Sequence, residues 1–395
     1  MKIVIFGLTM SSSWGNGHAT LWRGLCRALA TLGHECVFFE RDVPYYAHAR
    51  DCAAFPYATL ELYSDWPEAR PRVANALRDA DAAIVTSYCP DALDAAQEMF
   101  DLDCATTVFY DLDTPVTLSL LQAGENVPYI GAAGLSGFDL VLSYTGGAAL
   151  QQLSALLRAQ QVAPLYGHVD PQTHHRVEAA DRYRSDLSYL GTYAADRQDT
   201  LEQLFVVPAR VRPQQRFMVA GAQYPQDFPW SSNIYFVRHL PPAEHAAFFC
   251  SSRLTLNVTR RAMAELGWCP SGRLFEAAAC ATVVLSDEWP GLADFYTPGS
   301  EMLVAHDASE ALAALELSDP HIHRIGAAAR ARTLDCHTSL HRARELIALL
   351  EASGNTRARA AQAQPHLNWA DGGPEKTLAI QSESHQRSSF VSNPG

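Results

Sequence analysis

Residues 2–32 read KIVIFGLTMSSSWGNGHATLWRGLCRALATL, and they decide the fold expected for the first half of the chain. The run at 2–7 is apolar and β-rich, and the stretch at 18–32 has the composition of a helix. Gly15 and Gly17 lie between them, where they allow the backbone to turn tightly. A strand, a glycine turn and a helix in this order form the unit from which parallel, doubly wound sheets are built.

The same alternation continues along the chain. Further strands are predicted at 36–41, 82–87, 105–111 and 140–145, with helices at 68–79, 90–100 and 146–160. A second series of strands is predicted at 216–220, 234–238, 254–259, 282–286 and 302–305, with helices at 271–281 and within 321–352. The apolar runs lack a period of two, which is typical of strands that helices cover on both faces. We therefore predict an α/β protein with two Rossmann-like domains, each a doubly wound parallel sheet.

Turn-forming residues mark the boundary between the two series. Pro164, Gly167 and Asp170-Pro171 interrupt the alternation and indicate a connection between domains. We expect an N-terminal domain at 1–165, a linker at 166–185 and a C-terminal domain at 186–353. The stretch 354–395 is polar and has few aliphatic side chains to bury, so we expect it to be a disordered tail.

The composition excludes several classes of protein. No run approaches the roughly 18 apolar residues of a membrane span, and no secretory signal is recognisable, which predicts a soluble, cytoplasmic protein. The nine cysteines never form a Cys-x-x-Cys pair, so neither disulfides nor a zinc site are expected. A formal charge of −13 disfavours nucleic acid as a partner, because a phosphate backbone would be repelled.

Ligands of a doubly wound sheet bind beyond the carboxyl ends of its strands, so the turns after strands are the candidate sites. After the first strand, Trp14, Gly15, Asn16 and Gly17 precede His18, which opens the predicted helix. An imidazole with an ordinary pKa near about 6.5 suits deprotonation of an acceptor hydroxyl at a cleft edge. A histidine that merely fills the first helical turn explains the same pattern.

The turn after the strand at 105–111 carries two carboxylates. Asp111 and Asp113 are of the type that orients a hydroxyl or binds a metal. Thr114 and Pro115 follow them and fit a helix start, where acidic residues also complement the helix dipole. Asp111, nearer the strand, is a second candidate base, and Asp113 is a candidate cleft residue.

The segment 271–279 in the second half carries the most informative pattern. Ser271 is a natural helix N-cap, and Gly272 exposes the N–H groups of the first turn, where a diphosphate can dock. Arg273 and Glu276 are three residues apart and share a helix face. The guanidinium can therefore pair with phosphate while the carboxylate accepts hydrogen bonds from ribose hydroxyls. An Arg/Glu pair that only supports the helix has the same spacing.

Two further turns complete the candidate donor site. Asn257 lies within the predicted strand at 254–259. Arg260 directly follows this strand and adds positive charge for a diphosphate. Gly221 and Gln223 follow what we predict to be the first strand of the second domain, where a loop faces the cleft.

Together these segments resemble the CgeB-like glycosyltransferases, a bacterial family of the GT-B fold class, over about residues 1–350. The motifs that carry the resemblance are SWGNGH (13–18), YDLDTP (110–115), LNVTR (256–260), SGRLFEAAA (271–279), LSDEWPGL (285–292) and PGSE (298–301).

The resemblance implies two facing domains around a central cleft, a nucleotide-diphosphate sugar in the C-terminal domain and an acceptor in the N-terminal domain, with no metal or other cofactor. It also implies that Glu276 binds ribose, that Arg273 contacts the diphosphate or donor, and that His18 lies beside the acceptor. The large retaining group of GT-B enzymes has a glutamate eight positions before the ribose-binding one, where this chain has Trp268, so no retaining mechanism is assigned. Ala281 stands where many relatives have glycine, which predicts a tightly packed helix end.

The function expected is that of a hexosyltransferase-like enzyme, which moves a sugar from a nucleotide-diphosphate sugar to a hydroxyl-type acceptor. Two alternatives use the same fold and residues. One is a nucleotide-sugar epimerase or hydrolase, and the other is a non-catalytic protein that binds a sugar nucleotide or glycan.

Overall fold

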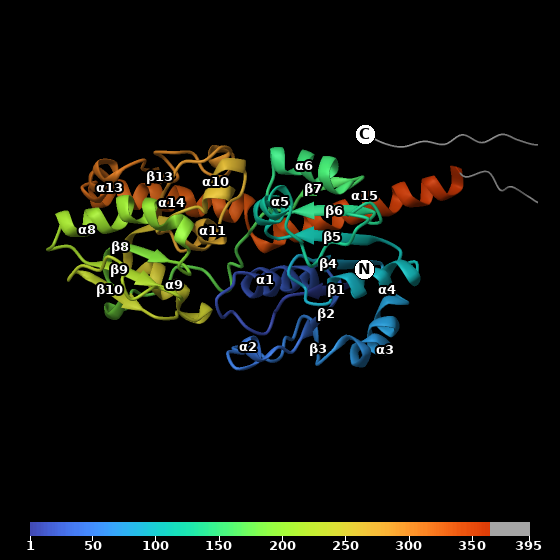
Figure 1. Cartoon of the computed structure of the whole chain (residues 1–395). Coiled ribbons are helices and arrows are strands. Elements are labelled where there is room, and N and C mark those ends of the chain that lie inside the picture. Colours follow the sequence, from blue (N-terminus) through green and yellow to red (C-terminus); the bar gives the residue numbers. More distant parts are fainter. Residues whose placement is uncertain (364–395) are drawn as a thin grey trace, which may run out of the picture.

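The computed structural model describes residues 1–363 and contains two parallel sheets that lie side by side (Figure 1). The first sheet has the strand order β3-β2-β1-β4-β5-β6-β7, and the second has the order β10-β9-β8-β11-β12-β13. The strands of the first sheet are Lys2–Gly7 (β1), Glu35–Arg41 (β2), Thr59–Tyr63 (β3), Ala82–Thr86 (β4), Thr107–Asp111 (β5), Leu140–Ser143 (β6) and Val162–Pro164 (β7). Those of the second are Ser185–Leu190 (β8), Phe217–Ala220 (β9), Ile234–Val237 (β10), Ser252–Asn257 (β11), Val283–Ser286 (β12) and Leu303–Val304 (β13).

Helices connect the strands and cover both sheets. In the first half they are His18–Thr31 (α1), Pro44–Ala47 (α2), Trp66–Leu77 (α3), Ala92–Asp101 (α4), Thr114–Gln122 (α5) and Ala148–Leu157 (α6). In the second half they are Gln198–Leu201 (α7), Val207–Val211 (α8), Pro242–Cys250 (α9), Arg261–Leu266 (α10), Gly272–Ala279 (α11), Leu292–Phe295 (α12), Ala308–Leu315 (α13), Asp319–Cys336 (α14) and Ser339–Ala363 (α15). Short segments Asp181–Tyr183 (η1), Ala195–Arg197 (η2) and the π-helical Glu202–Val206 (η3) complete them.

Each sheet starts at a central strand and winds outward in two directions. The chain fills one side of β1 or β8 first and then continues on the other side, so the strand order reverses between β1 and β4 and between β8 and β11. All named strand pairs are parallel. The predicted α/β fold of two doubly wound parallel sheets is confirmed, and its two reversal points are where ligands bind in such folds.

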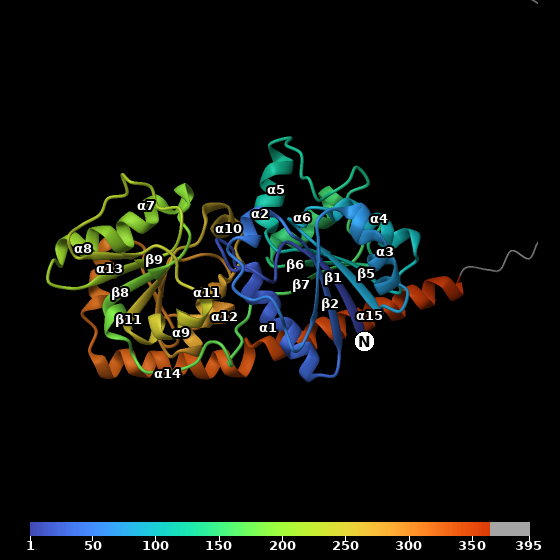
Figure 2. The ribbon, with the colours of Figure 1, turned by 90° about the horizontal axis from the view of Figure 1, so that it is seen from below.

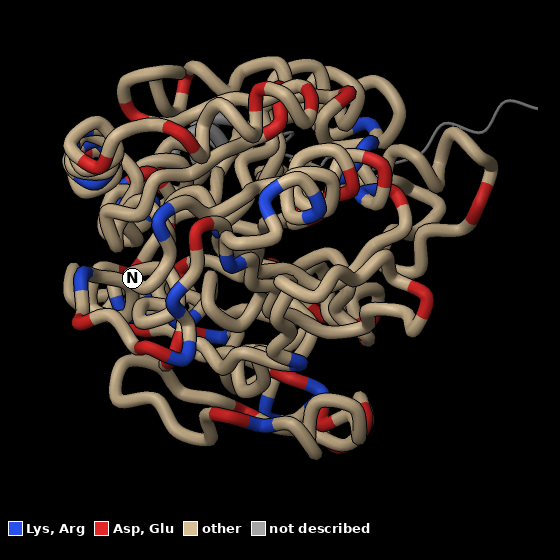
Figure 3. The backbone as a smooth tube through the Cα atoms, turned by 90° about the vertical axis from the view of Figure 1, so that its left-hand side faces the viewer, with Lys and Arg blue, Asp and Glu red and all other residues tan. Residues whose placement is uncertain are grey.

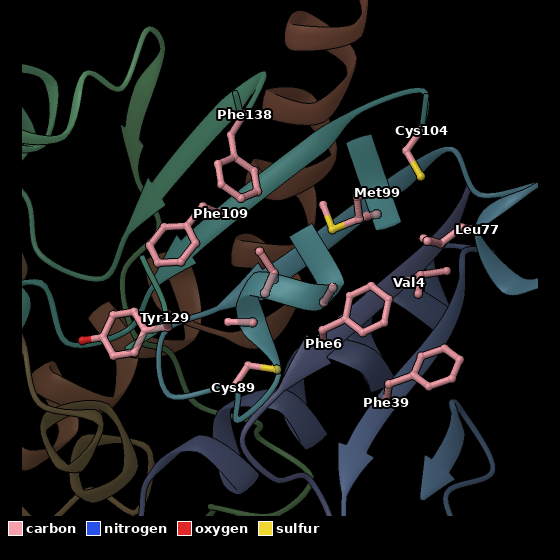
Figure 4. Close-up of a cluster of buried hydrophobic side chains, with 14 of the residues drawn as sticks. Val4, Phe6, Phe39, Leu77, Cys89, Met99, Cys104, Phe109, Tyr129 and Phe138 are labelled. Atoms are coloured by element: carbon pink, nitrogen blue, oxygen red, sulfur yellow. The ribbon is translucent and has the colours of Figure 1, made fainter. Parts of the chain in front are cut away.

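The first sheet is apolar on both faces. Val4 and Phe6 of β1 face one core, where Phe6 stacks on Phe39 of β2 and meets side chains from α4 (Figure 4). Ile3 and Ile5 of the same strand face the opposite core. Because successive side chains of a strand point to opposite faces, burial on both sides removes the alternation of polar and apolar residues.

The central strand of the second sheet, β8, was not predicted, and neither were β3 and β7. β8 reads SDLSYL, and its polar Ser188 is buried. The Ser188 hydroxyl donates to Thr255 Oγ1 on the neighbouring strand at 3.0 Å, which satisfies a polar group that would otherwise be costly to bury. The prediction that Gly221 follows the first strand of this domain is therefore wrong, because it follows the second strand, β9.

The last two helices lie against different sheets. In Figure 2, α14 runs along the second domain and α15 continues along the first. Ala343, Leu346 and Leu350 of α15 are buried in the core that also contains Ile3 and Trp22. The region 339–353, predicted as C-terminal domain, thus packs on the N-terminal domain, because its apolar side chains complete the core beneath α1.

The predicted disordered tail begins inside this helix. Positions 354–363 continue α15, and 364–395 lie outside the described residues. Among residues 1–363, none of the helices combines the length and the apolar character needed to span a bilayer.

Candidate functional site

A cleft of about 1090 Å³ opens between the two domains at the reversal points of their sheets. Most of the side chains and turns predicted from the sequence line it, namely Gly15, Asn16, Gly17, His18, Asp113, Gly221, Gln223, Arg260, Ser271, Gly272, Arg273 and Glu276. The structure does not place Trp14, Asp111 or Asn257 in the lining. The topology therefore brings together residues from turns that are far apart in the sequence.

The amino end of α11 faces the cleft. Ser271 is the N-cap residue and has an extended backbone, but its hydroxyl makes no capping hydrogen bond. The first N–H groups of a helix have no partner within the helix, and the helix dipole makes this end positive. The positive end of the helix at Ser271 and Gly272 therefore faces the cleft.

Arg273 is a buried cation beside this helix end. Its side chain is only 9% exposed, its Nη1 donates to Asn257 Oδ1 at 2.9 Å, and its guanidinium lies 5.0 Å from the centre of the Tyr189 ring. Burial lowers the pKa of Arg273. Within residues 1–363 its Nε–H lacks a hydrogen-bond acceptor. Asn257, predicted as a donor contact, is itself fully buried and instead positions this guanidinium.

Two more arginines line the same part of the cleft. Arg260 Nε donates to Asp196 Oδ2 at 3.2 Å. Arg197 follows β8, donates through Nη1 to the Thr192 carbonyl oxygen at 3.3 Å, and has a buried Nε without an acceptor among the described residues. Arg197 was not predicted because β8 was not, and the connection after the first strand of a doubly wound sheet is a candidate site only once that strand is recognised.

Glu276 lies one helical turn after Gly272, and its side chain is 14% exposed. His174 Nε2 and His245 Nδ1 each lie 3.9 Å from one of its carboxylate oxygens. Burial lowers the pKa of each histidine to about 4, so both imidazoles are neutral at pH 7. Neither histidine was predicted, because His174 comes from the expected linker and His245 from the apolar helix α9, and only the fold brings them to Glu276.

The wall of the cleft that the first domain forms contains His18, the first residue of α1. Burial lowers the pKa of His18 to about 4, and its Nδ1 is buried without a hydrogen-bond partner in the described chain. The ring meets Tyr88 edge-on, with 6.0 Å between ring centres. Asn16 Oδ1 accepts the backbone N–H groups of His18 and Ala19, so Asn16 caps the helix that carries this imidazole.

The two aspartates after β5 have different positions. Asp111 is fully buried, its Oδ1 accepts the Asp113 N–H at 3.0 Å, and burial raises its pKa to about 6. Asp113 lines the cleft, and its Oδ2 accepts the Tyr88 hydroxyl at 3.1 Å. Burial also raises the pKa of Asp113. The carboxylate that lines the cleft is therefore that of Asp113, while Asp111, a predicted base, is buried in the turn behind it.

The remaining predicted residues lie in or beside the walls of the cleft. Trp14 packs on His239 of the second domain, with 4.6 Å between ring centres, so it joins the two domains beside the cleft. Gly221 has φ +155°, and a Cβ there would lie 2.0 Å from the Gly191 carbonyl oxygen, so only glycine fits this close approach. Gln223 is exposed at the rim and has φ +64°.

Two facing doubly wound domains with a cleft at their reversal points define the GT-B architecture. Solved structures that share it include sucrose-phosphate synthase from Thermosynechococcus elongatus, with a TM-score of 0.65 and 14% identity over 91% of this chain and 99% of that one. Anabaena HepE in complex with UDP and glucose has a TM-score of 0.64 and 13% identity over 89% and 100%. An α-glucosyltransferase in complex with UDP and a 13-mer DNA has a TM-score of 0.68 and 10% identity over 89% and 99%. At these identities the likeness shows the fold.

The sequence of the second domain gives the more specific finding. Residues 197–348, from η2 to the first part of α15, match the model of the family described as glycosyl transferase-like. No curated protein is similar enough to count as a match. The chain thus carries a glycosyl transferase-like region on a GT-B fold.

Proposed function

We propose that this protein is a glycosyltransferase that moves a sugar from a nucleotide-diphosphate sugar to a hydroxyl of an acceptor. The observation that carries the proposal is the buried, incompletely paired guanidinium of Arg273 beside the open amino end of α11, one turn from the Glu276 carboxylate. A diphosphate supplies the acceptors that the guanidinium and the helix end lack. The Glu276 carboxylate accepts the ribose hydroxyls.

In the transfer, the acceptor hydroxyl attacks the anomeric carbon as the bond from that carbon to the diphosphate oxygen breaks. The departing diphosphate gains negative charge, which Arg197, Arg260, Arg273 and the α11 N–H groups stabilise. These arginines neutralise the diphosphate in place of a metal ion, so we propose metal-independent transfer. The acceptor proton goes to the His18 imidazole or the Asp113 carboxylate, which both line the opposite wall.

The motifs of α11 and of the turns after β1, β5 and β11 support the finer assignment to a CgeB-like enzyme with a hexose donor. UDP is the first nucleotide to test, because HepE and the α-glucosyltransferase were both solved with it. The acceptor we propose is a small hydroxyl compound or glycan rather than DNA. The formal charge is −13, and Figure 3 shows basic residues interspersed with acidic ones along the backbone.

The experiment that tests this function is mass-spectrometric product analysis with UDP-, GDP- and TDP-sugars, each with and without a panel of hydroxyl acceptors. We expect one donor to give a product whose mass equals acceptor plus sugar residue, and Glu276→Gln to lower its yield. Free or epimerised sugar formed without acceptor would establish the epimerase or hydrolase alternative instead. Donor binding without turnover, unchanged in His18→Ala, would establish a binding protein. Absence of nucleotide-sugar binding at millimolar concentration refutes the proposal.

A further inference from the structure

His174, His245 and Glu276 form a cluster on one wall of the cleft, which all three residues line. One ligand atom from each side chain lies within 4.8 Å of the other two. The three residues come from the loop after β7, from α9 and from α11. The fold thus assembles two imidazoles and a carboxylate at a position that an ion can reach from the cleft.

The imidazoles are oriented toward the carboxylate. His245 Nε2 contacts the Leu240 carbonyl oxygen at 3.1 Å, and because a carbonyl only accepts, this nitrogen carries the hydrogen. The lone pair of the neutral ring is therefore on Nδ1, which lies 3.9 Å from Glu276 Oε2. A hydrogen bond from one ring nitrogen to a carbonyl is the arrangement that orients histidines as metal ligands.

His174 supplies the second, independent observation. Its side chain is 3% exposed, and neither ring nitrogen has a hydrogen-bond partner among residues 1–363. Its Nε2 lies 3.9 Å from Glu276 Oε1, which is too long for a hydrogen bond. Burying a polar ring without a hydrogen-bond partner costs free energy. A ligand between these side chains would give the ring nitrogen its partner.

We propose that His174, His245 and Glu276 bind a divalent cation of the Zn²⁺ type. Two imidazole nitrogens and one carboxylate oxygen are a ligand set that Zn²⁺ prefers, and they leave a fourth position for water. With Zn–N and Zn–O bonds of about 2.0–2.2 Å, tetrahedral ligand atoms lie roughly 3.3 Å apart, so side-chain rotations must close separations of up to 4.8 Å between the three ligand atoms. Mg²⁺ prefers oxygen ligands and is not expected to bind.

The ion and the donor nucleotide require the same carboxylate. This second part rests on the proposed function, which assigns Glu276 to the ribose hydroxyls, whereas the metal site itself does not depend on it. An ion bound to one oxygen of Glu276 competes with the ribose hydroxyls for this carboxylate. The cluster then acts as an inhibitory site at which a Zn²⁺-type cation excludes the sugar nucleotide.

The metal site is tested by titrating the chelator-treated full chain with Co²⁺ in the absence of nucleotide. We expect visible d–d absorption bands for one tightly bound ion, without the near-ultraviolet band of sulfur ligands, and displacement of Co²⁺ by Zn²⁺ but not by Mg²⁺. His174→Ala and His245→Ala should each weaken binding by at least about 10-fold, as loss of even an outer ligand does. Absence of the bands, or the same affinity in both variants, overturns the site.

Two matched variants control for other metal-binding groups. His306 is exposed between the Glu288 and Glu310 carboxylates, each 2.7 Å from one of its ring nitrogens, and Cys250 is a partly exposed thiol. His306→Ala and Cys250→Ser should leave the Co²⁺ affinity and spectrum unchanged. A loss of Co²⁺ affinity in either variant would show that the ion binds at that residue instead. If His174→Ala or His245→Ala fails to fold, crystals of the wild type grown with Zn²⁺ show whether the ion binds at this site. An anomalous-scattering peak must then lie between the three side chains.

The competition is tested by calorimetric titration of UDP, or of whichever nucleotide diphosphate binds, with and without a saturating Zn²⁺ concentration. We expect the apparent Kd to rise at least about 10-fold in the wild type and much less in His245→Ala, whose titration also corrects for chelation of Zn²⁺ by the diphosphate. An equal rise in both proteins overturns the competition. If no nucleotide binds the metal-free protein, the proposed function fails, while the Co²⁺ spectrum still decides the metal site.

Discussion

The substitution Arg273→Met separates the proposed role of this guanidinium from a structural one. Methionine keeps an unbranched side chain of similar length but removes the charge and the hydrogen-bond donors. Hydrogen bonds to charged groups contribute about 1.5–3 kcal/mol, and about 1.4 kcal/mol corresponds to a tenfold change in Kd. Loss of one such bond to the diphosphate should therefore raise the Kd for UDP, or for the cognate nucleotide, about 10- to 150-fold.

The free energy of unfolding should respond differently from the affinity. Arg273→Met leaves the Asn257 Oδ1 without its donor, but it also removes a buried cation that is incompletely paired. These two effects oppose each other, so we expect stability to change by less than about 2 kcal/mol.

The assay is calorimetric titration of UDP and of uridine, together with urea unfolding. The matched control is Arg261→Met, because Arg261 is 65% exposed and lies outside the cleft lining. UDP affinity should fall in Arg273→Met alone, while uridine affinity stays the same. An unchanged UDP affinity, or an equal loss for uridine, would refute a diphosphate contact.

Three further outcomes follow from the same structure. His18→Ala or Asp113→Asn, whichever removes the base, should lower kcat about 10²- to 10⁴-fold without changing the nucleotide Kd. Single-turnover kinetics and calorimetry measure the two quantities. An unchanged kcat in both variants would exclude both residues as bases. Burial lowers the pKa of His18, His174, His245 and His337 to about 4 and that of His168 to about 3. These side chains take up protons mainly on unfolding, so the free energy of unfolding should fall as pH decreases from about 6.5 toward 4, although Asp111, with its pKa raised to about 6, acts in the opposite direction. Urea unfolding at several pH values checks this, and a stability that is constant or rises on acidification would contradict it. Ala281 follows Cys280, the C-cap of α11, and has φ +59°. Ala281→Gly should therefore raise the urea midpoint and stabilise the fold by up to about 1 kcal/mol. A lower midpoint would show that the left-handed backbone is not strained there.

The fold could be predicted because strands such as β1 are apolar on both faces and are followed by helices at regular intervals. β8 was not predicted because Ser188 makes its sequence look polar. The burial of Ser188 is explained only by its hydrogen bond to Thr255 on the neighbouring strand β11. α15 was recognisable as helical, but its sequence does not say which of two apolar sheets it covers. That choice depends on contacts with α1 that are remote in sequence.

The candidate site shows the same division. Ser271, Gly272, Arg273 and Glu276 were predictable because their chemistry lies within one short segment at a helix start. His174 and His245 were not, since nothing local distinguishes them from other histidines of the chain. Only the structure distinguishes Asp111 from Asp113. Asp111 ends β5 and is fully buried, whereas Asp113, two residues further on, lines the cleft.

We propose that a nucleotide-diphosphate sugar binds at the amino end of α11 and the turns after β8, β9 and β11. Hydrogen–deuterium exchange of the full chain, with and without UDP, GDP and TDP, tests it most directly. We expect one nucleotide to slow exchange in 190–197, 221–223, 258–261 and 271–276, and Arg273→Met to reduce this protection. If none of the nucleotides slows exchange in these segments at millimolar concentration, the donor does not bind at the amino end of α11.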